Sequence, residues 1–379
     1  MITAPLNDKQ RIHAVLEGKP VDRMPVTCLY NQLVILDHFA ELAGKPDWQR
    51  HEWLNAAPAD HLATYRTILE RAPFEILQPQ HAAPRSEREN TKFVVDGGRV
   101  YRKDMRSGAL TLLQAMSGHA TDYRANETQL VHDRHDIDEQ FKLQTAEQKI
   151  ADGIYDFVHE TVAELGSDHF ILTGGVVGTL YLCHNYVGLT NLFELLASDP
   201  DLIDYLSQKI LEQNIEDIRA QASAGGDAIY IDDATATSDM ISVRHYERFC
   251  LPYMKQMVDE IHRLGHKAIV IYFGGVADRL EQITSLGADG LSVETSMKGY
   301  TNDIQSIARR VGRRVTLFGN IDPVGVLQDG TDAQLEAEIH RQTVAAKLAR
   351  GFIMCTGSPI TPSTSLQRMR RFIDLSRAA

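Results

Sequence analysis

Short apolar runs alternate along the chain with longer segments whose apolar residues recur every three or four positions. Each run is apolar at nearly every position, which is typical of parallel strands that are buried on both faces. Most runs are followed by a helical pattern, so the chain predicts alternating strands and helices. The runs are 24–29, 74–77, 170–173, 228–231, 268–271, 290–293, 315–318 and 352–355.

The helical segments after the later runs are long enough to cross back over a sheet. The last is opened by Thr331 with Gln334 three residues on, which is a capping-box pattern. Eight strands that alternate with helices predict a single-domain (β/α)₈ barrel over residues 1–379, with a doubly wound open sheet as the alternative. The expected helices include Tyr246–Leu264, Ala277–Leu286, Ile304–Val311 and Asp332–Ala349.

The alternation is interrupted between the second and third runs. Residues 91–95 and 99–102 flank Asp96-Gly97-Gly98, a turn pattern that predicts a β-hairpin. We therefore expect an insertion at about residues 79–145, at the end of the barrel where the strands finish. The sequence does not decide whether it is a lid over the site or a structural decoration.

Composition and charge narrow the class of protein. Hydrophobic residues make up 43% and charged residues 24% of the chain, which indicates a folded globular protein. A formal charge of −12 argues against a nucleic-acid partner. The start of the chain shows no signal peptide, and no apolar run is long enough to cross a membrane. Four dispersed cysteines without a CxxC pair fit a reducing cytoplasm.

Polar residues that follow the apolar runs are the candidate site, because a barrel carries its reactive groups at the carboxyl ends of its strands. In chain order they are Tyr30, Asn31, His184, Asp232, Asp233, Tyr272, Glu294, Asn320, Asp322 and Cys355.

Several of these candidates also have structural interpretations that the sequence leaves open. Asp232 and Asp322 could cap helices, and His184 could be a hydrogen-bonded structural residue. Tyr272 could pack against the next helix, and Cys355 could be a small buried apolar residue.

Several segments together resemble the uroporphyrinogen decarboxylase superfamily. They are RIHAVLEGKPVDRMPV near the start, GGVVGTLYL at 174–182, the stretch from Gly226 through LPYMKQM, FGNIDPVGVLQDGT at 318–331 and SPITPS before the last helix. The resemblance implies a (β/α)₈ barrel with its site at the carboxyl mouth. It also implies one of two activities: decarboxylation of uroporphyrinogen without a cofactor, or methyl transfer between a corrinoid protein and a thiol or another acceptor.

The decarboxylase branch is marked by an arginine-rich motif after the first strand and by a late histidine. Residues 25–32 contain no arginine, and Met354-Cys355-Thr356-Gly357 replaces the histidine motif. The branch's substrate carries eight carboxylates, and gathering them without cationic partners is costly. We therefore do not expect this chain to decarboxylate uroporphyrinogen.

The methyltransferase branch is marked by zinc held by His-x-Cys after strand five and by a cysteine after strand eight. Cys355 matches that last cysteine, but Ile271-Tyr272-Phe273 replaces the His-x-Cys. We therefore do not expect the family's standard zinc site. Cys355 is then either a residual metal ligand or a packed remnant.

The leading hypothesis is a methyltransferase that moves a methyl group between a small molecule and a corrinoid protein or folate. Tyr272 and Glu294 would assist the reacting atom and Asp233 would orient the substrate, while Tyr30 and Asn320 would donate hydrogen bonds. The alternatives are a cofactor-independent decarboxylase or lyase and a non-catalytic binding barrel. A homodimer is compatible with the sequence but is not required by it.

Overall fold

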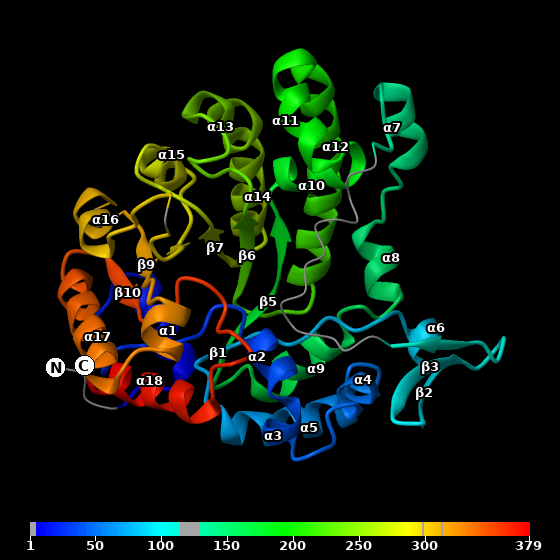
Figure 1. The fold of residues 1–379 in the computed structure, drawn as a ribbon, viewed down its shortest axis with the longest axis horizontal. Coiled ribbons are helices and arrows are strands. Elements are labelled where there is room, and N and C mark those ends of the chain that lie inside the picture. Colours follow the sequence, from blue (N-terminus) through cyan, green and yellow to red (C-terminus); the bar gives the residue numbers. More distant parts are fainter. Residues whose placement is uncertain (1–4, 114–128, 298, 312–313) are drawn as a thin grey trace.

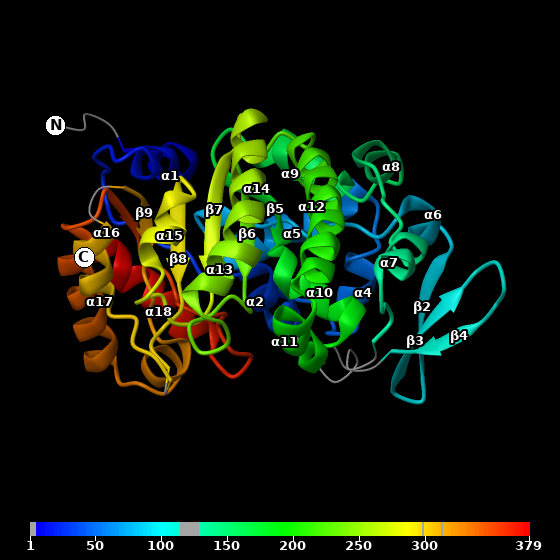
Figure 2. The same ribbon diagram turned by 90° about the horizontal axis from the view of Figure 1, so that it is seen from above.

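The computed structural model describes residues 5–113, 129–297, 299–311 and 314–379. Its centre is a curled sheet of seven parallel strands in the order β1-β5-β6-β7-β8-β9-β10, surrounded by helices (Figures 1 and 2). Seven of the eight expected runs form these strands. They are β1 (Ile76–Leu77), β5 (Phe170–Val177), β6 (Ala228–Asp233), β7 (Lys267–Tyr272), β8 (Gly290–Val293), β9 (Thr316–Phe318) and β10 (Gly351–Ile353).

The first run, residues 24–29, contributes a single parallel bridge instead of a strand. Val26 pairs with Met354, and the Thr27 N–H donates to the Met354 carbonyl at 2.9 Å. Side chains connect the other side of this run to β1. Asn31 Nδ2 donates to the Ile76 carbonyl at 2.6 Å, and the Asn31 N–H donates to Gln78 Oε1 at 2.8 Å. We call this boundary between residues 24–29 and β1 the seam.

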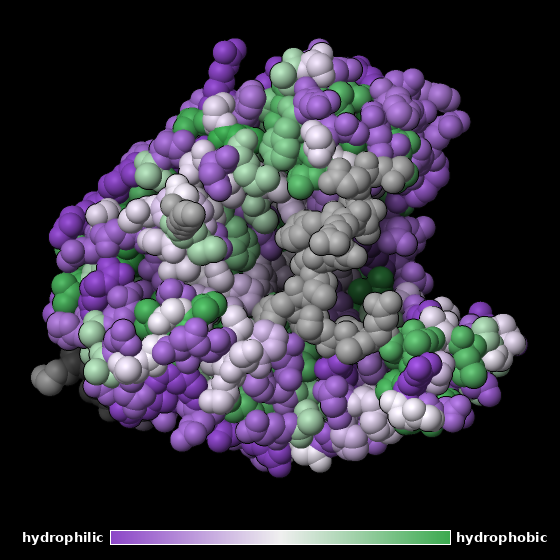
Figure 3. All heavy atoms as spheres, in the orientation of Figure 1, coloured by the Kyte–Doolittle hydropathy of each residue, from purple (hydrophilic) through white to green (hydrophobic). Residues whose placement is uncertain are grey.

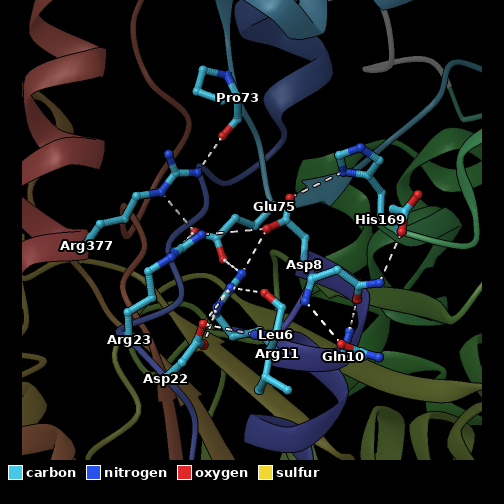
Figure 4. A network of polar contacts seen from close by, with 12 residues as sticks. Leu6, Asp8, Gln10, Arg11, Asp22, Arg23, Pro73, Glu75, His169 and Arg377 are labelled. Carbon is cyan, nitrogen blue, oxygen red and sulfur yellow. Dashed lines mark hydrogen bonds and ion pairs between the residues drawn. The ribbon is translucent and has the colours of Figure 1, made fainter. Parts of the chain in front are cut away.

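An ion-pair network lies at the amino-terminal end of the seam (Figure 4). Its centre is Glu75, which precedes β1 and is fully buried. Glu75 pairs with Arg11 of α1 (Asp8–Leu16) at 3.3 Å, with Arg23 at 2.5 Å and with Arg377 of α18 (Leu366–Ala378) at 3.2 Å. The network therefore ties both sides of the seam to the first and last helices.

Helices cover the outside of the sheet, so its strands are apolar on both faces. The helices before β5 are α2 (Asn31–Asp37), α3 (Phe39–Ala43), α4 (Gln49–Trp53), α5 (Pro58–Arg71), α6 (Arg85–Arg88), α7 (Arg134–Gln140), α8 (Ala146–Ala151) and α9 (Asp156–Leu165). Those after it are α10 (Thr179–Val187), α11 (Leu189–Ser198), α12 (Pro200–Ala222), α13 (Val243–Phe249), α14 (Leu251–Arg263), α15 (Leu280–Ser285), α16 (Ile304–Val311), the π-helix η2 (Pro323–Gln328) and α17 (Asp332–Ala346). None of the described helices is long and apolar enough to cross a membrane.

The predicted helix 246–264 is divided in two. The chain leaves the helical conformation at Cys250 and resumes with Pro252 in the first turn of α14. Proline lacks an N–H and its ring clashes with the preceding turn, so it starts a new helix. The capping box of Thr331 and Gln334 is present at the start of α17.

A separate antiparallel sheet lies at one side of the molecule (Figures 1 and 2). Its strands are β2 (Thr91–Asp96), β3 (Arg99–Asp104) and β4 (Leu110–Leu112). Gly97 and Gly98 turn between the first two with positive φ angles of 53° and 75°, as a tight hairpin requires. Apolar side chains of this sheet are exposed, and green atoms gather over it in Figure 3. Part of the predicted insertion, residues 114–128, lies outside the described residues.

Candidate active site

A cavity of about 800 Å³ opens at the carboxyl ends of the parallel strands. Residues that follow several different strands line it, as expected for an α/β sheet that carries a binding site. Its polar and aromatic lining residues include Tyr30, Tyr181, Asp232, Phe273, Glu294 and Tyr300. Three of the predicted site residues, Tyr30, Asp232 and Glu294, are therefore brought together.

Tyr30 and Asp232 form a hydrogen-bonded pair in this cavity. The Tyr30 hydroxyl donates to Asp232 Oδ2 at 2.5 Å, while Asp232 Oδ1 is buried and has no hydrogen-bond partner among the described residues. Burial raises the pKa of Asp232 to about 6, and the bond from Tyr30 opposes that rise. The helix-capping interpretation of Asp232 is therefore not what the structure shows.

The backbone of Tyr30 is itself unusual. Among the described residues it is the only non-glycine residue with a positive φ, at 50°. A tyrosine in the left-handed region carries a local conformational cost that the surrounding structure must offset. Tyr30 directly follows the first run, so its backbone conformation sets the direction in which its ring enters the cavity.

Glu294 follows β8 and is fixed by three donors. Its Oε2 accepts the Gly274 N–H at 2.7 Å and the Tyr300 hydroxyl, and its Oε1 accepts the Ser358 hydroxyl at 3.1 Å. Gly274 has a φ of 94°, and a Cβ there would lie 2.3 Å from Thr237. A glycine is therefore required where the backbone approaches both Thr237 and the Glu294 carboxylate.

Asp233 and Tyr272 do not line this cavity, which corrects the expectation that they share it with Tyr30 and Glu294. Side chains alternate along a strand, and in β6 Asp232 faces inward while Asp233 faces the helices. Tyr272 likewise belongs to the outer apolar cluster, and its hydroxyl donates to the Ala236 carbonyl.

Behind the sheet, Asp233 is 1% exposed and its Oδ2 has no hydrogen-bond partner among the described residues. Burial, together with the Asp232 charge, raises the pKa of Asp233 to about 8, and Arg279 opposes the rise. Arg279 is fully buried and donates to the carbonyls of Ala236 and Ile241. The two hydrogen bonds from Arg279 hold the segment after β6 in place.

The amide candidates support the cavity from behind. Asn31 binds β1 at the seam, as described above. Asn320 Nδ2 donates to the carbonyls of Asn302 at 2.8 Å and Glu294 at 3.3 Å, so it positions the backbone that carries Glu294. Neither amide belongs to the lining of the cavity.

Two further candidates have structural contacts. Asp322 Oδ1 accepts the N–H groups of Val324 and Gly325, which makes it the cap of η2. His184 lies on α10, with Nδ1 against the Tyr181 carbonyl and its ring 4.6 Å from the Tyr181 ring. It contacts a lining residue without lining the cavity.

Cys355 lies fully buried in the inner apolar cluster. Burial and the neighbouring Cys28 raise the pKa of its thiol well above the ordinary value. Among the described residues no three His, Cys, Asp or Glu side chains are grouped so that they could hold a metal ion. The described surroundings of Cys355 therefore do not supply the further donors that a tetrahedral zinc site requires.

Sequence reasoning missed Tyr181, Asp239 and Tyr300, which line the cavity, and Asn302 behind it. Tyr300 and Asn302 lie several residues beyond the end of β8, and Asp239 lies beyond the end of β6. A search restricted to strand ends cannot find them, and only the loop conformation returns them to the site.

Arg85 and Arg88 of α6 are basic residues of the segment between β1 and β5. Both pair with Asp156, at 2.7 Å and 2.5 Å, and line a different depression together with His159. They do not belong to the lining of the cavity between Tyr30 and Glu294.

A cavity at the carboxyl edge of a curled parallel sheet is the arrangement of α/β enzymes with helices around the sheet. The family model described as Uroporphyrinogen decarboxylase (URO-D) matches residues 105–379. The chain belongs to this uroporphyrinogen decarboxylase family, whose members are enzymes, and the resemblance seen in the sequence is confirmed.

The chain has relatives among methyltransferases and among uroporphyrinogen decarboxylases. The methylcobamide:CoM methyltransferase MtbA of Methanosarcina acetivorans is 23% identical over 365 residues, covering 95% of this chain and 96% of that protein. The uroporphyrinogen decarboxylase of Tolumonas auensis is 30% identical over 184 residues, covering 48% of this chain and 49% of that protein. A solved methyltransferase from Methanosarcina mazei shares the fold, with a TM-score of 0.68, 18% identity and 98% of both chains covered.

Proposed function

We propose that this protein is a (β/α)₈-barrel methyltransferase that moves a methyl group between a small molecule and a corrinoid or folate carrier. The observation that carries the proposal is the charge of the cavity. It is lined by Asp232, Asp239 and Glu294, and no lysine, arginine or histidine is among its described lining residues. A substrate with eight carboxylates would be repelled by such a surface.

Methyl transfer needs a cavity that orients the methyl-bearing atom and tolerates its change of charge. Tyr30 and Tyr300 supply hydroxyl groups, and each is already hydrogen-bonded to a carboxylate of the cavity. The pairs Tyr30–Asp232 and Glu294–Tyr300 therefore take over the roles that the sequence gave to Tyr272 and Asp233. A corrinoid would supply the centre that accepts or gives up the methyl group.

The extent of the relationship supports the same choice. The match to MtbA runs along nearly the whole of both chains, whereas the match to the Tolumonas decarboxylase covers about half of each. A corrinoid protein is the partner that this proposal implies.

The test measures both activities on the same purified protein. Methyl transfer to or from free cobalamin is followed by its visible absorption, and uroporphyrinogen turnover is followed by product analysis. We expect methyl transfer that Asp232→Asn and Glu294→Gln both reduce strongly. Formation of coproporphyrinogen without any methyl transfer would overturn the proposal and make the protein a decarboxylase.

A further inference from the structure

The described lining of the cavity has three acidic residues and no basic one; Lys298, between the lining residues Met297 and Gly299, lies outside the described residues. Asp232 accepts one hydrogen bond from Tyr30, and Asp239 accepts one from Thr237 at 2.5 Å. Both donors are neutral hydroxyl groups. A positive charge that enters the cavity would find Asp232 and Asp239 paired, among the described residues, with neutral groups.

One atom of the cavity lacks the partner that its chemistry requires. Asp232 Oδ1 is buried and receives no hydrogen bond from any described residue, although Oδ2 of the same carboxyl is held by Tyr30. A buried acceptor left unpaired is costly, and such atoms are normally satisfied by protein, water or a ligand. Because Asp232 lines the cavity, a bound molecule can supply the missing donor.

A positively charged ligand also needs a surface that attracts the parts of it that do not contact Asp232. Aromatic rings in the cavity supply this surface. Tyr30 and Phe273 lie nearly parallel, with centroids 6.3 Å apart and an interplanar angle of 20°. Tyr181 and Tyr300 also line the cavity. The faces of aromatic rings attract cations and are the usual seat of alkylated ammonium groups.

We propose that the cavity binds a small alkylated ammonium ion, with its charged nitrogen near Asp232 and its alkyl groups against Tyr30 and Phe273. This deepens the proposed function and rests on it, because such an ion would be the methyl-bearing small molecule. A metal ion is a poorer occupant, since the described acidic groups are not gathered closely enough to hold one. Organic cations are broad enough to touch acids and rings on several walls.

The experiment compares two molecules of the same shape. 2-(Dimethylamino)ethanol is protonated at neutral pH and carries one N–H, while 3-methylbutan-1-ol has a neutral C–H in the place of that nitrogen. Isothermal titration of the full chain should show that the cation binds at least roughly tenfold more tightly, since charge pairing and ring contacts act only on the cation. Equal binding of the two, or binding of neither, would overturn the proposal.

Variants show whether the binding takes place in this cavity. Asp232→Asn and Glu294→Gln should each weaken the cation at least several-fold and leave the neutral alcohol unchanged. Asp201→Asn, a matched change at an acid whose side chain is 76% exposed on α12, should leave both affinities unchanged. Thermal unfolding of each variant checks its fold, and two folded cavity variants that bind the cation like the parent would overturn the assignment.

The binding result separates this proposal from the proposed function. Tight cation binding without methyl transfer to cobalamin would refute the methyltransferase assignment and keep the ligand class. Methyl transfer from a neutral donor, with no preference for the cation in titration, would refute the ligand class alone.

Discussion

Asp232 and Asp233 are consecutive in sequence but lie in two different environments. One shares a cavity with Tyr30, and the other is buried behind the sheet near Arg279. Burial raises the pKa of both carboxyl groups, to about 6 and about 8. The folded protein therefore keeps these protons to a higher pH than the unfolded chain does, and both acids make folding less favourable as the pH rises.

Asp233→Asn should stabilise the protein at high pH. The unfolded carboxyl ionises near 3.8, while the folded one ionises at about 8. Between these values the unfolded chain has already lost the proton, so the free energy of unfolding falls as the pH rises and stays lowered above pH 8. Asparagine cannot ionise. Urea denaturation at pH 5 and pH 9 should show a larger advantage of the variant at pH 9, and an equal difference at both would contradict this account.

Tyr30→Phe should raise the pKa of Asp232 above its value of about 6. The hydroxyl that donates at 2.5 Å stabilises the ionised carboxylate, and phenylalanine cannot replace it. The affinity for 2-(dimethylamino)ethanol, which requires the ionised acid, should then fall away at a higher pH than in the parent. A pH series of titrations measures the shift, with Tyr205→Phe as control, at a half-buried tyrosine of α12 whose hydroxyl donates to Asp138.

At the residue scale, the sequence predicted the types of side chain at the site but not the face of the sheet to which each side chain points. The run 228–231 is apolar at every position, so its pattern gives no sign of which face looks inward. The substrate-orienting role was predicted for Asp233, whereas the alternation of side chains in the sheet places Asp232 in the lining of the cavity. The pairing of Glu294 with Tyr300 depends on a loop conformation that no periodicity describes.

The loop that follows β8 is the element on which the site depends most. Asn302 is 2% exposed, and its Nδ2 donates to the carbonyls of Gly274 at 2.9 Å and Glu294 at 3.0 Å. Its Oδ1 accepts the Val276 N–H at 3.2 Å. One side chain thus joins the loops that follow β7 and β8.

Asn302→Ala should destabilise the protein and impair the site. It leaves buried backbone groups without partners, which costs about 1–3 kcal/mol in free energy of unfolding. The displaced Glu294 should reduce methyl transfer by up to roughly a hundredfold, because small misplacements are costly in catalysis. Urea denaturation and the cobalamin assay measure the two effects. Asn90→Ala, at an exposed turn, is the control, and loss of stability with full activity would show that Asn302 does not position Glu294.

The sequence predicted those features of the helices and strands that depend on neighbouring residues. The capping box at Thr331 and the turn at Gly97-Gly98 could be predicted because neighbouring residues determine both. The break at Cys250 was also legible in principle, since Pro252 stands inside the predicted helix. The first run forms a single bridge instead of a strand. The number of its residues that pair depends on tertiary contacts with the edge of the sheet, which the local sequence does not specify.

At the scale of the whole molecule, the seam is held by side chains. Glu75 and its three arginines act at one end of β1, and Asn31 acts at the other. A buried carboxylate among arginines is strongly coupled to them, so removing one partner leaves uncompensated charge.

Glu75→Gln should therefore lower the free energy of unfolding by about 3–5 kcal/mol. Glu336→Gln, which removes an exposed pair with Arg371, should change it by about 1 kcal/mol or less. Chemical denaturation of both variants gives the comparison. Similar small losses in the two would mean that the network at the seam is dispensable.

The other side of the first run has a consequence for the order in which the molecule assembles. There Val26 pairs with Met354, and the Leu29 N–H donates to Thr356 Oγ1, a partner 327 residues away in sequence. Closing so large a loop is slow, while neighbouring βα units can associate through local contacts. On the ribosome, the partners of the first run at β1 emerge early, but its partners after β10 emerge only with the end of the chain. We therefore expect the contacts between the first run and the segment after β10 to form last, so that weakening them accelerates unfolding while leaving the folding rate nearly unchanged.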